Sequence, residues 1–132
     1  AFNSSFEMGV FEYLANLFPQ YETHLKNLHS NFVDLWDPFK NSSYVSHEMR
    51  GLTGIKTVLP ALVPDYKDAY KNLDLVKNGG EAMYYYEQLG EEVRKKDSDL
   101  ELINRYRSSL EKYCELDTLG MVQIVKKLRE LI

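Results

Sequence analysis

The chain has 132 residues, of which 44% are hydrophobic and 27% charged, a composition typical of a folded domain rather than a disordered segment. At this length we expect a single domain over residues 1–132. The net charge of -4 argues against a nucleic-acid-binding surface, which would usually be basic. No apolar run approaches the ~20 residues of a membrane span. Cys114 is the only cysteine and cannot form an internal disulfide, which favours a reducing, cytoplasmic location.

Helical periodicity begins near the start of the chain, where apolar residues recur at gaps of three and four. These residues form a first apolar stripe along one face of a helix. Pro19 is expected to kink or split this helix because proline removes a backbone donor. The "WDPF" stretch at 36–39 predicts a helix junction, with Asp37 as a cap and Pro38 in a first helical turn. The residues of the stripe are Phe6, Val10, Leu14, Leu17, Tyr21, Leu25, Leu28, Phe32 and Leu35.

Two further stripes follow. The second is interrupted by Pro60 and Pro64, so a break is expected at 59–64, and "KNGGE" at 77–81 is the clearest turn signal. In the third stripe, the polar stretch at 95–99 is a candidate interruption, and "LDTLG" at 116–120 predicts a junction to a last short helix. The second stripe contains Val45, Met49, Leu52, Leu59, Leu62, Tyr66, Ala69, Leu73 and Val76, and the third Ala82, Tyr86, Leu89, Val93, Leu100, Ile103, Tyr106, Leu110 and Tyr113.

No segment shows sustained strand alternation. The predicted fold class is therefore all-α, an antiparallel helical bundle of four long helices plus short terminal helices. The heptad-like spacing leaves a long coiled-coil hairpin open as an alternative. The predicted interior consists of Leu14, Leu17, Leu25, Leu28, Phe32, Leu35, Met49, Leu52, Leu89 and Val93.

One histidine stands out in the stretch "YVSHEMRGLTGIKTVLP" at 44–60, which the periodicity predicts to be helical. On a helix, His47 would lie about 200° from Val45, away from the apolar stripe. Arg50, Gly51 and Gly54 follow at spacings of three, four and seven and would share its face. An imidazole can attack a phosphoryl group, a guanidinium can stabilise its oxygens, and glycines would leave room for a partner. The other histidines, five residues apart at 24 and 29, have poor spacing for a metal site, and none is predicted.

The segment "SHEMRGLTG" resembles the motif of histidine-containing phosphotransfer (HPt) domains, and "LANLFPQYETHLKNLHSNFVDLWD" resembles that family's second helix. The resemblance implies a four-helix bundle with an exposed histidine in mid-helix. It also implies His47 as phosphoryl acceptor, Arg50 as the phosphate-stabilising residue, and Gly51 and Gly54 as a docking surface for a receiver domain or histidine kinase. Such a domain carries a phosphoryl group without hydrolysing ATP and needs no cofactor of its own. The residues that carry the motif are Ser46, His47, Met49, Arg50, Gly51 and Gly54.

The same stretch also resembles the H-box of histidine-kinase dimerisation domains, although no ATP-binding motif accompanies it. A second class of function stays open beside phosphotransfer. The long stripes also suit a non-catalytic helical scaffold or adaptor that binds another helical protein, for example in membrane trafficking or autophagy. Phosphotransfer requires an exposed His47, whereas a scaffold is indifferent to this residue.

Overall fold

The computed structural model describes residues 1–131, and within them it contains helices and no strands, which confirms the all-α prediction. The chain divides into two compact units, Ala1–Val58 and a second that begins at Leu59. The expectation of a single domain stays a prediction. The described part has six α-helices of very different lengths, so the four-helix bundle is not confirmed.

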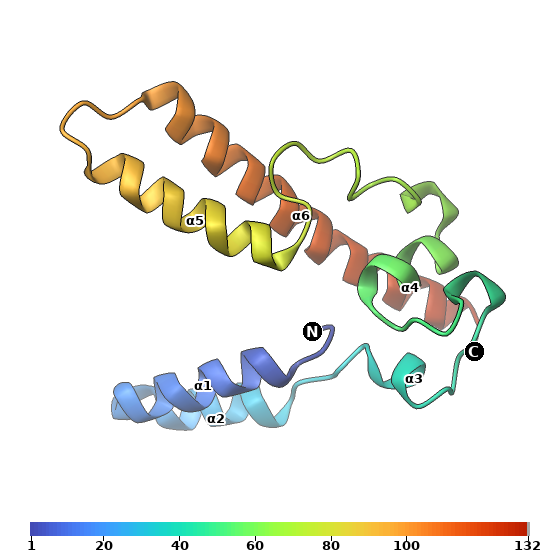
Figure 1. Ribbon diagram of the computed structural model, residues 1–132. Coiled ribbons are helices and arrows are strands. Elements are labelled where there is room, and N and C mark those ends of the chain that lie inside the picture. The colour runs from blue at the N-terminus through green and yellow to red at the C-terminus, as the bar shows by residue number, and fades with distance from the viewer. Residues whose placement is uncertain (132) are drawn as a thin grey trace. The chain divides into compact units, whose positions relative to one another are not determined.

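The first unit opens with two helices that lie side by side (Figure 1). Helix α1 covers Ser5–Leu17, and α2 covers Glu22–Ser30 after the short 3₁₀ helix η1 at Pro19–Tyr21. The predicted break at Pro19 is confirmed, because α1 ends before it. Phe11 and Phe32 pack edge to face with ring centroids 5.4 Å apart. Aromatic packing therefore helps to join α1 to the segment that follows α2.

Asp34 ties this following segment back to the start of α1. Its Oδ1 accepts hydrogen bonds from the backbone N–H groups of Asn3, at 2.8 Å, and Trp36, at 2.9 Å. Its Oδ2 accepts from the Ser4 N–H at 2.9 Å and the Ser4 hydroxyl at 3.0 Å. Burial raises the pKa of Asp34, but the hydrogen bonds outweigh it, so the pKa lies below its ordinary value. The carboxylate is thus the centre of a small hydrogen-bond network.

Helix α3, Asp37–Lys40, is a single turn with Pro38 at its beginning, as predicted. Its N-cap is Trp36 and makes no side-chain capping bond, so the prediction of Asp37 as the cap is wrong. Phe39 is buried between two other rings, stacked on Phe2 and edge to face with Tyr44. Phe39, Met49 and Val58, rather than a leucine stripe, are the most deeply buried side chains of the first unit.

The predicted continuous helix through 44–60 is wrong. Only the 3₁₀ helix η2, His47–Met49, and helix α4, Ile55–Leu62, are present. Between them Arg50 has φ 49° and Gly51 has φ 77°, both left-handed. Two successive left-handed residues end a right-handed helix, and glycine adopts this conformation without a steric penalty. The break predicted at 59–64 is confirmed: α4 ends at Leu62, and a further 3₁₀ helix, η3, covers Pro64–Tyr66.

The second unit contains the two longest helices, α5 at Gly79–Arg94 and α6 at Leu100–Glu130, which form a hairpin (Figure 1). Asn78, inside the predicted turn, caps α5 by accepting the Glu81 N–H at 2.9 Å. The segment before α5 is tied to α6 by Asp74, which accepts two hydrogen bonds from Arg105 at 3.0 and 3.1 Å. Side chains thus fix both the start of α5 and the approach to it.

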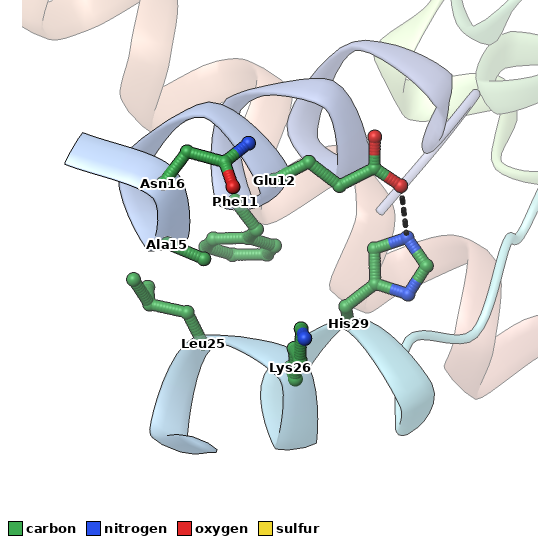
Figure 2. Close-up of a pocket in the computed structure, with 7 residues that line it drawn as sticks. All are labelled: Phe11, Glu12, Ala15, Asn16, Leu25, Lys26 and His29. Carbon is green, nitrogen blue, oxygen red and sulfur yellow. Dashed lines mark ion pairs between the residues drawn. The ribbon is translucent and has the colours of Figure 1, made fainter. Parts of the chain in front are cut away.

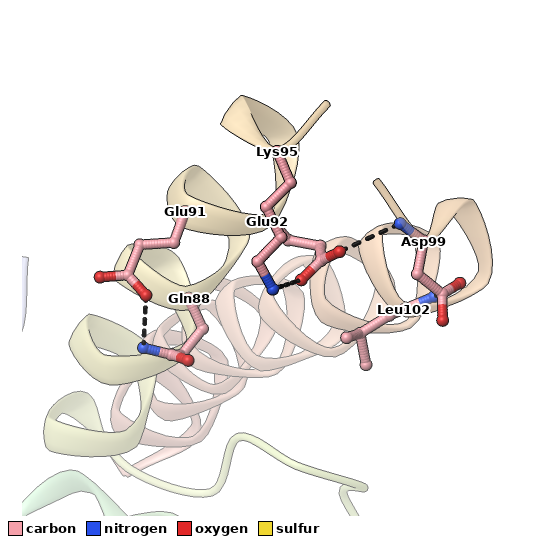
Figure 3. Close-up of polar contacts among 6 residues, drawn as sticks. All are labelled: Gln88, Glu91, Glu92, Lys95, Asp99 and Leu102. Carbon is pink, nitrogen blue, oxygen red and sulfur yellow. Dashed lines mark hydrogen bonds and ion pairs between the residues drawn. The ribbon is translucent and has the colours of Figure 1, made fainter. Parts of the chain in front are cut away.

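The loop between α5 and α6 lies at 95–99, as the polar stretch predicted. Glu92 is buried and holds the loop: its Oε1 accepts the Asp99 N–H at 3.0 Å and its Oε2 the Lys95 ammonium at 2.5 Å (Figure 3). These two donors lower the pKa of Glu92, the backbone N–H contributing most. Asp99 then caps α6 by accepting from the N–H groups of Glu101 and Leu102.

The junction predicted at 116–120 is wrong, because α6 runs through it without a break. Gly120 is buried in mid-helix, so tertiary packing outweighs its unfavourable helix propensity of roughly 1 kcal/mol. The predicted interior is also only partly right. Met49 is buried, whereas Leu17, Leu28, Leu52 and Val93 are exposed and the other five are half-buried. The buried apolar residues are Ala15, Phe39, Met49, Val58, Leu59, Tyr70, Val76, Ile103 and Ile124.

Candidate functional site

The predicted phosphotransfer residues lie in the irregular stretch between α3 and α4. His47 is exposed, as predicted, and so are Arg50, Gly51 and Gly54. They do not share a helical face, because no helix runs through them. A Cβ added at Gly51 or Gly54 would meet no atom within 4 Å. The left-handed backbone of Gly51 explains why glycine stands there, so close access for a partner is not needed to account for it.

The immediate surroundings of His47 are polar. The Ser46 hydroxyl donates to Glu48 Oε2 at 2.7 Å, and this hydrogen bond lowers the pKa of the Glu48 carboxyl. Met49 is buried and anchors the turn, while His47, Glu48 and Arg50 are exposed. An exposed imidazole on an anchored turn can be reached by another protein, with the ring itself as the reacting group.

A different surface stands out on α1. Phe6, Val10, Tyr13 and Leu17 are all exposed, Phe6 at 77% and Tyr13 at 65% of their full accessibility. At 100° per residue these four side chains fall within an arc of about 60°. We call them the α1 outer face. They recur at gaps of four, three and four, the spacing of a helix that packs lengthwise against another element.

The opposite side of α1 is apolar as well and packs on α2. Figure 2 shows Phe11 and Ala15 of α1 directed toward Leu25 of α2. They lie in an open groove of about 410 Å³, whose rim carries Glu12 and His29 in an ion pair at 3.4 Å. A helix that is apolar on two opposite sides is normally buried on both. In α1 one side is packed and the other is exposed.

The charges of α1 are all negative. Glu7 and Glu12 are its only charged residues, and it has no lysine or arginine. Glu7 lies beside the outer face, about 60° from Val10. Its Oε2 is buried and has no hydrogen-bond partner among the described residues. Buried carboxylate oxygens are normally paired. The Glu7 oxygen is therefore an unpaired acceptor inside the described part of the chain.

The second unit contains a polar cluster that was not predicted from the sequence. The buried Tyr70 donates its hydroxyl to Asp117 Oδ1 at 2.6 Å, and Tyr113 also hydrogen-bonds Asp117. Burial first, and then these bonds to the carboxylate, raises the pKa of both phenols, which remain protonated donors. The spacing of four between Tyr113 and Asp117 on α6 was a usable signal, whereas Tyr70 lies 47 residues from Asp117 in sequence. The cluster holds the segment before α5 on α6.

Comparison with known proteins gives one finding. Residues 1–54 match the model of a family described as "Domain of unknown function (DUF2779)". No curated protein and no solved structure matches the chain. The matched stretch contains α1, α2, α3 and the His47 turn, and its description states no activity.

Within residues 1–131, no group of three or more His, Cys, Asp and Glu side chains is arranged to hold a metal ion. In the same part of the chain no helix combines the length and apolar character needed to cross a membrane.

Proposed function

We propose that this chain is a non-catalytic helical interaction module whose α1 outer face binds another protein. The observation that carries this proposal is the two-sided apolar character of α1, with one side packed on α2 and the other exposed. Single exposed apolar residues are ordinary on protein surfaces, whereas a contiguous row marks a contact site. We further propose a cytoplasmic location, which the free, exposed thiol of Cys114 supports.

The partner is expected to be apolar in the middle and basic at the edge. Fully burying a Phe or Leu side chain stabilises a complex by about 1.5–3 kcal/mol relative to leaving it exposed. The four residues of the outer face can therefore supply a hot spot in spite of the cost of association. Helix α1 carries two acids and no base, which favours a lysine or arginine on the partner.

Site-specific photocrosslinking in cells tests the proposal. A photoreactive phenylalanine derivative would replace Tyr13, and the control would carry it at Tyr84, which has a similar exposure on α5. The expected result is a discrete adduct from position 13 that disappears when Phe6→Asp and Leu17→Asp are added. If position 13 gives no discrete adduct, or one that survives both substitutions, the outer face does not bind a protein.

Phosphotransfer at His47 is the second candidate, and the exposed ring with an exposed Arg50 three residues later supports it. In this reaction the phosphoryl group passes from an aspartyl phosphate of the donor to an imidazole nitrogen. A P–N bond forms while the donor carboxylate is released. Incubation with a labelled donor should give a label that is stable to base and labile to acid. A label with the opposite stability would place the phosphoryl group on another type of side chain.

A further inference from the structure

We draw no further inference here: the strongest candidate, the exposed apolar row of Met83, Tyr86 and Val93 on α5 with the open groove of about 550 Å³ beside it, carries none because nothing in the structure shows what covers it, and the acids and bases that line the groove favour no one class of partner.

Discussion

The two helical hairpins of this chain, α1–α2 and α5–α6, are held together in different ways. In α5–α6 the helix starts are capped by Asn78 and Asp99, and the connecting loop is held by the buried Glu92. Neither α1 nor α2 has a side-chain capping bond, and α2 has no fully buried residue. The first hairpin is instead closed by Asp34. This residue follows α2 and accepts hydrogen bonds from the backbone N–H groups of Asn3 and Ser4, which lie just before α1.

This difference shows which parts of the molecule are locally encoded. Caps and turns act over a few residues, so α5–α6 carries its boundary signals within its own sequence. The α1–α2 hairpin depends on one long-range carboxylate network and on aromatic packing. We therefore expect α1–α2 to gain more stability from a bound partner than α5–α6 does.

The largest expected effect contrasts a buried apolar residue of α6 with an exposed one of α1. Ile124 is fully buried, and Ile124→Ala should lower the free energy of unfolding by about 2–5 kcal/mol through lost burial and a cavity. Leu17, on the α1 outer face, is 53% exposed, and Leu17→Ala should change it much less. Chemical denaturation followed by circular dichroism measures both. Equal losses would mean that Leu17 is buried in the free protein in solution, contrary to the structure.

Much of the helical pattern could be predicted from sequence, because it depends on local chemistry. The breaks at Pro19 and at 59–64 and the polar loop at 95–99 are where they were expected. The single helix through His47 was wrong because periodicity does not reveal a pair of left-handed residues such as Arg50 and Gly51. The junction at 116–120 was wrong because a glycine can remain in a helix when packing favours it.

The candidate site was harder to predict than the helices. The spacing of apolar residues shows that one side of a helix is apolar, but it does not show whether another part of the chain covers that side. For this reason Leu17 and Val93 were predicted to lie in the interior, and both are exposed. The contact between Tyr70 and Asp117 depends on the tertiary fold, and spacing within one helix cannot supply it. The exposure of His47 was predicted correctly, although from a helical wheel that does not apply there.

The next prediction tests the long-range bond that holds the first unit. Asp34→Asn preserves the shape of the side chain but turns an amide nitrogen toward donors that need an acceptor. The expected loss is about 2 kcal/mol in the free energy of unfolding. Asp37→Asn is the matched control, since that exposed carboxylate does not cap its helix. A loss no larger than that of the control would show that Asp34 does not hold the first unit together.

The stabilisation from Asp34 should also depend on pH in a defined direction. Its pKa is lower in the folded protein than its ordinary value of 3.8. The stabilisation is therefore complete above about pH 4 and is lost as the pH falls through the lower, folded pKa. The difference between wild type and Asp34→Asn should be constant near neutral pH and shrink below pH 4. A difference that grows on acidification would contradict the assignment.

A smaller effect is expected at the start of α6. Asp99→Ala removes the acceptor for the N–H groups of Glu101 and Leu102 and should cost about 1 kcal/mol. Asp97→Ala, two residues earlier in the same loop, is the control and should be nearly neutral because Asp97 caps no helix. If the two variants lose equal stability, the cap does not distinguish α5–α6 from the uncapped α1–α2 hairpin.

The smallest expected effect on stability comes with the most informative readout for function. His47→Gln removes an exposed side chain away from caps and buried residues, so the free energy of unfolding should change by under ~0.5 kcal/mol. If the interaction module is the correct function, crosslinking from Tyr13 is also unchanged. If phosphotransfer operates, the same variant loses all acid-labile label while it remains folded. Arg50→Ala should then slow labelling without abolishing it, since a guanidinium stabilises phosphoryl oxygens but does not form the P–N bond. Labelling that continues at the wild-type rate in His47→Gln would remove His47 as the acceptor and leave the exposed face of α1 as the functional surface of the first unit.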